Sequence, residues 1–280
     1  MGKVFVLDVA KCTGCYNCQL VCKDEHCGND WKPYAAPQPE TGHFWCKLVD
    51  HPRGTIPRVK IHYIAHMCGH CDNMLCADVC EVGAITKRDD GLVLIDPDKC
   101  NGCMKCVDSC PTKSIYINEE LNIAQKCTGC AHLLDNGAKL PRCVDSCPTD
   151  ALMFGDAADF TDMIKDATVF APETAPHIYY LNIPGRWIGG TVYDPDIKKV
   201  IIGAKVTLTC PDGDCSCESC EGSGKCEEVT NDFGDFWFKN LKETKFDITI
   251  EAEGYETKEF KGLDTSEDIN LNDIPMKKIG

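Results

Sequence analysis

The stretch Cys100-Asn-Gly-Cys103-Met-Lys-Cys106-Val-Asp-Ser-Cys110-Pro111 decides the fold of the first half of this 280-residue chain. Three cysteines follow one another at intervals of two residues, and a fourth comes three residues later, directly before a proline. Three closely spaced thiols on one loop face a common centre, whereas a fourth that follows a short helical turn points away from it. The stretch therefore predicts two neighbouring metal centres that share their ligands.

Three further groups of cysteines lie on either side of this stretch. The first has the same spacing from Cys12 to Cys22, and the second, from Cys68 to Cys80, has two extra residues before its third cysteine. The fourth, from Cys127 to Cys147, is split by twelve residues. This spacing is typical of bacterial ferredoxins. We therefore expect sixteen thiolates that bind four [4Fe-4S] clusters in a tandem ferredoxin-like domain.

The four motifs are expected to work in pairs. Motifs two and three pair by the ferredoxin rule, in which three ligands go to one cluster and the fourth to its neighbour, and this leaves motifs one and four to pair by elimination. The predicted ligand sets are set A with Cys12, Cys15, Cys18 and Cys147; set B with Cys22, Cys127, Cys130 and Cys143; set C with Cys68, Cys71, Cys76 and Cys110; and set D with Cys80, Cys100, Cys103 and Cys106.

Composition favours metal ligation over disulfides. The chain has 23 cysteines, yet residues 1–8 lack the basic segment and the long apolar stretch of an export signal. Zinc is the alternative for paired cysteines, but a run of three at this spacing followed by a fourth and a proline fits a closed tetrahedral site poorly. The net charge of −15 argues against nucleic-acid binding. No apolar stretch is long enough to span a membrane directly.

The second half has a different pattern. No cysteine occurs between Cys147 and Cys210, and β-branched and aromatic runs such as 199–208, 235–238 and 246–251 follow. We predict an α+β chain, with the ferredoxin-like domain at 1–180 and a small all-β sandwich at 181–280. The sandwich carries a cysteine-rich insert at 210–226. Its four candidate zinc ligands are Cys215, Cys217, Cys220 and Cys226, with disulfides or free thiols as the alternatives.

Several other side chains have no place in the ligand sets. Cys27 and Cys46, in the loop between motifs one and two, are interpreted as ordinary buried thiols. Four histidines flank ligand positions, where they either donate hydrogen bonds to cluster sulfur or simply lie at a surface: His62, His66, His70 and His132. We assign none of them a catalytic role.

The motifs, with segments such as 96–103, 125–132 and 141–147, resemble the iron–sulfur (beta) subunits of dimethyl sulfoxide reductase-family molybdopterin oxidoreductases. The resemblance covers residues 1–180 and implies a large catalytic subunit that carries a molybdenum or tungsten bis-pterin. The segments 188–193, 203–208 and 230–238 resemble a β-sandwich of carboxypeptidase-regulatory or Cna-B type. Together the two parts are similar to the small subunits of pyrogallol-phloroglucinol transhydroxylases and of related anaerobic aromatic hydroxylases and dehydroxylases.

This resemblance implies an electron relay with no catalytic site on this chain. The chain would pass electrons between the partner and an external donor or acceptor, in a heterodimer acting on polyhydroxylated aromatics. The alternatives are a mainly structural subunit of a redox-neutral transhydroxylase and a free-standing polyferredoxin. We expect a cytoplasmic location, and export together with a signal-bearing partner stays an open alternative.

Overall fold

The computed structural model describes residues 2–210 and 224–279. The chain divides into two compact units. Unit 1 contains Met1–His51 and His62–Ile183, and unit 2 contains Pro52–Ile61 and Pro184–Gly280. The sequence predicted a boundary after residue 180 but placed the whole of 52–61 in the first domain. In the structure, this segment is the tip of a hairpin and packs with unit 2.

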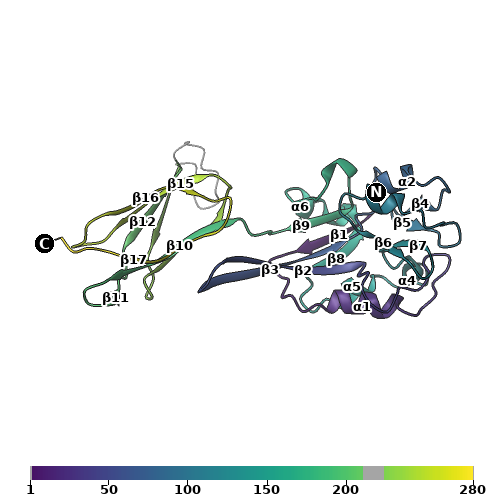
Figure 1. Cartoon of the computed structure of the whole chain (residues 1–280), viewed down its shortest axis with the longest axis horizontal. Coiled ribbons are helices and arrows are strands. Elements are labelled where there is room, and N and C mark those ends of the chain that lie inside the picture. The colour runs from purple at the N-terminus through teal and green to yellow at the C-terminus, as the bar shows by residue number, and fades with distance from the viewer. Residues whose placement is uncertain (1, 211–223, 280) are drawn as a thin grey trace. The chain divides into compact units, whose positions relative to one another are not determined.

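Unit 1 is built on a three-stranded sheet with β1 (Lys3–Asp8) at its centre (Figure 1). β1 runs antiparallel to β8 (Leu152–Asp156) and parallel to β9 (Ile178–Leu181). Residues 4–7 are all buried, which explains why this strand is a continuous apolar run and does not alternate. Because β1 leads into motif one and β8 follows motif four, their pairing brings the two distant motifs together.

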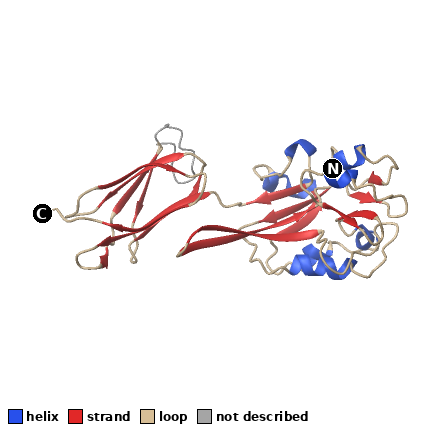
Figure 2. Cartoon of the chain, viewed as in Figure 1, coloured by secondary structure: helices blue, strands red, loops and turns tan. Residues whose placement is uncertain are grey.

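Short helices and hairpins complete unit 1 (Figure 2). In each motif the third cysteine lies on a short helix, so the fourth follows within about one turn of it. The helices are α1 (Asn17–His26), α2 (Leu75–Asp78), α3 (Lys105–Ser109), α4 (Ala131–Asp135), α5 (Arg142–Asp145) and α6 (Thr161–Ile164), with 3-10 turns at Ala157–Phe160 and Pro172–Thr174. The hairpins are β2 (Cys46–Thr55) with β3 (Arg58–Met67), β4 (Ile85–Lys87) with β5 (Val93–Ile95), and β6 (Ile115–Asn118) with β7 (Ile123–Lys126).

Unit 2 consists of two four-stranded sheets whose inner faces share one core. Buried and partly exposed residues alternate along β14 and β15, as expected for strands with one face on a core. Phe236, Phe238, Phe246 and Ile248 are among its largest fully buried side chains. One sheet contains β10 (Arg186–Asp194), β11 (Lys199–Val200), β14 (Asp235–Leu241) and β17 (Ile269–Pro275); the other contains β12 (Lys205–Thr209), β13 (Lys225–Val229), β15 (Lys245–Glu251) and β16 (Lys258–Asp264).

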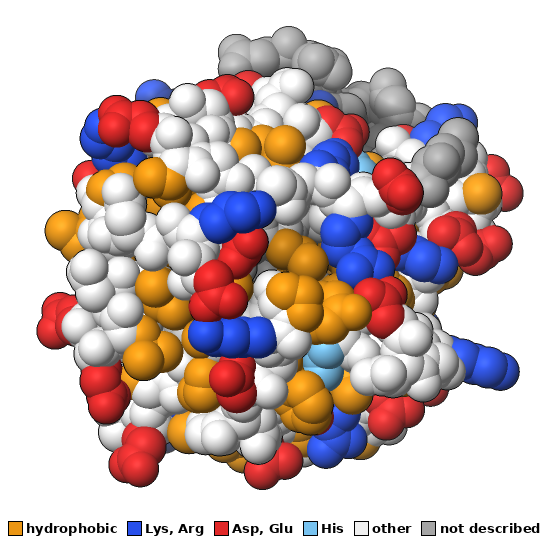
Figure 3. All heavy atoms as spheres, turned by 90° about the vertical axis from the view of Figure 1, so that its right-hand side faces the viewer, with side chains coloured by type: hydrophobic (Ala, Val, Ile, Leu, Met, Phe, Trp, Pro, Cys, Tyr) orange, Lys and Arg blue, Asp and Glu red, His pale blue; other side chains and the backbone are white. Residues whose placement is uncertain are grey.

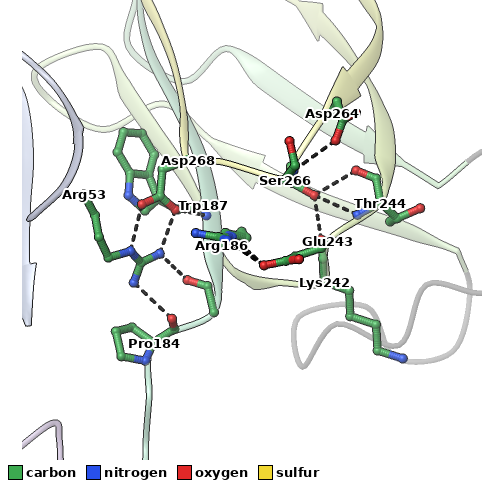
Figure 4. Close-up of polar contacts among 12 residues, drawn as sticks. Arg53, Pro184, Arg186, Trp187, Lys242, Glu243, Thr244, Asp264, Ser266 and Asp268 are labelled. Atoms are coloured by element: carbon green, nitrogen blue, oxygen red, sulfur yellow. Dashed lines mark hydrogen bonds and ion pairs between the residues drawn. The ribbon is translucent and has the colours of Figure 1, made fainter. Parts of the chain in front are cut away.

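Two arginines attach the hairpin tip to the rest of unit 2. The Arg53 guanidinium makes a bidentate pair with Asp268, at 2.7 and 2.8 Å, and also donates to the carbonyl of Pro184 (Figure 4). Arg58 pairs with Asp235 at 2.5 Å. Both pairs are largely buried, where a bidentate arginine is worth more than an exposed ion pair. This explains why residues 52–61 belong to unit 2.

The sandwich core yields a test with a matched control. Phe238 is 1% exposed and Phe233, five residues away, is 73% exposed. Phe238→Ala should lower the free energy of unfolding by about 3–5 kcal/mol, because it removes buried apolar contacts and leaves a cavity. Phe233→Ala should change it by less than about 0.5 kcal/mol. Calorimetry of the whole chain measures both, and equal effects would contradict the assigned core.

Candidate metal centres

The structure brings the predicted cysteines together in the four sets. All of set A lines one cavity, all of set C lines a second, and all of set D lines a third. The members of set B are all buried, and charge on Cys127, Cys143 and Cys130 raises the pKa of Cys22 in addition to the larger effect of burial. Each set therefore draws its thiols from two motifs.

The loop before the second cysteine of each motif has an unusual backbone. In motifs one, three and four, this position is glycine, with φ of +70°, +70° and +63° at Gly14, Gly102 and Gly129. The Gly129 N–H donates to the Cys127 sulfur at 3.3 Å. This left-handed conformation turns backbone N–H groups toward the thiols, and glycine adopts it at little cost. Motif two has His70 at the same position, with φ of +47°.

The thiols of the four sets are crowded and partly or fully buried, so their thiolate forms would be stabilised by a cationic group. Among the residues that the structure describes, no three His, Cys, Asp or Glu side chains are arranged to hold a single metal ion. Burial raises the pKa of Cys127 to about 12 and those of Cys76 and Cys106 to about 11, and neighbouring thiols of the same sets add to these shifts. Positive iron would offset this repulsion by binding the thiolate form.

Contacts between sets place them in a linear order. Motifs one and four each give ligands to sets A and B, and motifs two and three to sets C and D. Sets B and C adjoin. In addition to burial, the charge of Cys68 in set C raises the pKa of Cys127 in set B, so these two thiols lie near each other. The order is therefore A, B, C, D. Within the sixteen cysteines, Cys15 of set A and Cys103 of set D are the exposed ones, so both ends of this order reach the surface.

Cys46 has a position that the sequence did not reveal. It is 1% exposed and hydrogen-bonds to Cys143 of set B and Cys18 of set A. These thiols and burial raise the pKa of Cys46 well above its usual value. Cys27 is only half-buried, and its sulfur lies 3.9 Å from the carbonyl of Pro39. Cys46 differs from Cys27 in lying near thiols of two motifs. Spacing along the chain does not encode such a position.

The histidines that flank the motifs have different environments. His62 and His66 lie on β3, where they stack against His51 and Phe170. His132 is buried, and its Nε2 contacts Glu25 at 3.0 Å. His70 lines the cavity of set C.

Sequence reasoning missed one further histidine near a ligand set. His26 is buried at the end of α1, with its Nε2 at 4.0 Å from the sulfur of Cys130. Burial, together with the charge of His132, lowers the pKa of His26 to about 3, so its ring is neutral at neutral pH. Its position one turn after Cys22 was a usable signal, because residues four apart lie on one face of a helix.

The predicted zinc ligands of the insert fall mostly outside the described residues. Cys215, Cys217 and Cys220 lie in the segment 211–223, which the structure does not describe. Cys226 is buried on β13 and takes part in a disulfide, which is the chemistry of one of the alternatives. The zinc site stays a prediction.

Thiols in fours on a ferredoxin-type frame define an iron–sulfur protein, and the comparisons agree. The family model described as "4Fe-4S dicluster domain" matches residues 59–157. The pyrogallol hydroxytransferase small subunit of Pelobacter acidigallici is 37% identical over 89% of this chain and 90% of that protein. The B subunit of tetrathionate reductase from Salmonella typhimurium is 34% identical over 65% and 73%. The B subunit of the anaerobic dimethyl sulfoxide reductase of Escherichia coli is 33% identical over 64% and 85%.

This protein belongs to the family of iron–sulfur subunits of molybdopterin oxidoreductases. The predicted resemblance to this family, and within it to the small subunit of a pyrogallol hydroxytransferase, is confirmed. Among solved structures, the major pilin subunit of Bacillus cereus is 18% identical. The matched region covers 36% of this chain and 32% of the pilin, with a TM-score of only 0.26. Within residues 2–210 and 224–279, no helix is long and apolar enough to cross a membrane.

The two loop cysteines yield a second test. Cys46→Ala should lower the free energy of unfolding by about 1–3 kcal/mol, because it removes a fully buried thiol together with its contacts to Cys18 and Cys143. Cys27→Ala should change it by less than about 0.5 kcal/mol. Thermal unfolding measures the difference, and iron analysis should find unaltered iron in both variants. Loss of iron from either would contradict its interpretation as a residue that binds no metal.

Proposed function

We propose that this chain is the electron-transfer subunit of a molybdopterin oxidoreductase complex, and that sets A to D hold four [4Fe-4S] clusters. The observation that carries the proposal is the unbroken order of four thiol sets between exposed Cys15 and exposed Cys103. A [4Fe-4S] cluster held by four thiolates exchanges one electron at a time. The chain itself fixes the distances between the sites, and no bond of a substrate is made or broken on it.

The protein around the sets favours transfer along one path. Set B is buried on every ligand, so electrons reach it through its neighbours and not from solvent. Sets A and D have one exposed cysteine each and are the natural points of entry and exit. We therefore expect the catalytic partner to contact one of these ends and an external donor or acceptor to reach the other.

Leu20, two residues after Cys18 of set A, is 59% exposed, and set D, at the other end of the order, has two exposed apolar side chains at its cavity. Val82 and Met104 line the cavity of set D and are 41% and 49% exposed. Exposed apolar side chains beside a functional site are typical of docking surfaces. Figure 3 shows hydrophobic side chains interspersed with acidic and basic ones on one face of unit 1. We propose that a large subunit carrying a molybdenum or tungsten pterin covers this end.

Coverage of the relatives supports an aromatic substrate for the complex. The pyrogallol hydroxytransferase small subunit aligns with 89% of the chain, whereas the tetrathionate and dimethyl sulfoxide reductase subunits align with 65% and 64%. An alignment over 89% of this chain must include most of unit 2. We propose that the complex acts on polyhydroxylated aromatic compounds, with the substrate pocket on the partner.

Electron paramagnetic resonance of the complex tests the relay. The complex is reduced with dithionite under anaerobic conditions, freed of excess reductant and mixed with a polyhydroxylated aromatic substrate. If the chain is a relay, the signals of reduced clusters should decay during turnover. Signals that stay unchanged while product forms would instead favour a mainly structural subunit. Purification of the chain without any molybdenum- or tungsten-containing partner would favour a free-standing polyferredoxin.

Ligand substitution tests the cluster count. Cys130→Ser removes one thiolate of set B, and we expect loss of up to about four of about sixteen iron atoms per chain. Cys27→Ser, which changes a cysteine outside the sets, should retain all of them. Iron and sulfide analysis of the anaerobically purified chain measures both. Full iron retention in Cys130→Ser, with unchanged cluster spectra, would contradict the assignment of set B.

A further inference from the structure

His70 is held in a backbone conformation that the other motifs give to glycine. Its φ of +47° lies in the left-handed region, where Gly14, Gly102 and Gly129 occupy the equivalent positions. A histidine is uncommon there, and a strained residue persists only when its surroundings hold it in place. The path of the backbone alone would favour glycine here, so the imidazole side chain itself is expected to have a role.

Hydrogen bonding determines which nitrogen of His70 carries the proton. The N–H of Val93 donates to Nδ1 at 2.9 Å, so Nδ1 is an acceptor and the proton of the neutral ring lies on Nε2. The side chain is 1% exposed, and burial together with the charge of Lys126 lowers its pKa well below the ordinary value. Nε2 has no hydrogen-bond partner among the described residues, although His70 lines the cavity of set C.

Lys126 places a buried positive charge beside the same cavity. It is 2% exposed, and its Nζ donates to the carbonyls of Val93 and Cys127. Among the described residues it has no carboxylate within ion-pair distance. Its charge lowers the pKa of Cys76 in set C and of Cys127 in set B. A buried ammonium without an anion is costly, so thiolate sets on both sides are the natural counter-charge.

We infer that His70 and Lys126 form a device that sets the potential of the set C site: Nε2–H of His70 donates to sulfur there, and Lys126 supplies a fixed positive charge. The inference rests on the proposed function. When this site accepts one electron, its negative charge grows by one, and no proton moves and no bond breaks. A donor to sulfur and a nearby cation both stabilise the more negative state. Both residues therefore raise the reduction potential.

Two substitutions test the inference in the full chain, purified anaerobically and titrated with redox mediators while cluster signals are recorded. His70→Gly restores the residue that three other motifs have, so the backbone is relieved while the donor is lost. Lys126→Met removes the charge and keeps an unbranched side chain that is one atom shorter. His70→Gly should lower one reduction potential and Lys126→Met at least one, in each case by at least a tenfold change in the equilibrium constant, about 59 mV for one electron, with iron content retained.

Lys87→Met is the matched control, because the Lys87 ammonium donates to the carbonyl of Cys71 of set C but pairs with Asp72 near the surface. It should shift the potential far less than Lys126→Met. Unchanged potentials in His70→Gly, or equal shifts in Lys87→Met and Lys126→Met, would overturn the inference and leave the proposed function standing. Absence of any reducible [4Fe-4S] signal in the unaltered chain would overturn both.

Discussion

The sharing of cysteines between motifs is the constraint on which the rest of unit 1 depends. Each motif gives cysteines to two sets, so no set is complete until two distant segments meet. The pairing of β1 with β8 satisfies this constraint for sets A and B, because it brings the two ends of unit 1 together. Short helices satisfy it locally by separating the third cysteine from the fourth. Most of the helices and strands of unit 1 are short, and bound metal would add cross-links between the loops that join them.

The sandwich follows a different physical rule. Its strands bury one continuous core of apolar side chains from two sheets, and its described residues provide no thiol to sets A to D. Loss of metal would therefore remove what organises unit 1 and leave the core of unit 2 intact. The arginines of the hairpin tip contribute buried ion pairs to unit 2. Unit 2 is therefore made of two separate segments of the chain, Pro52–Ile61 and Pro184–Gly280, although its core is continuous.

Spacing along the chain, with elimination for the outer motifs, predicted four groups of cysteines, and the members of sets A, C and D each line one cavity in the structure. It was not enough to find Cys46, the first residue of β2, which interacts with Cys18 and Cys143. The sequence did not reveal that residues 52–61 belong to unit 2 for a similar reason, because Arg53 and Asp268 are 215 residues apart along the chain and come together only on folding. β-branched and aromatic runs predicted strands at 235–238 and 246–251, where β14 and β15 lie, whereas the run 199–208 divides into β11 and β12, which belong to different sheets. Long-range polar contacts leave no such pattern.

Burial and polar contacts act in opposite directions along the proposed path. A buried site disfavours the state with more negative charge, so burial alone would make set B, whose ligands are all buried, the hardest to reduce, whereas the ligands of the other inner set, C, are all partly exposed. The buried polar groups His26, His70 and Lys126 lie beside these two inner sets. Their dipoles and charge act against the effect of burial. An inner site that was much harder to reduce than its neighbours would block the flow of electrons, so polar groups are needed most where water is excluded.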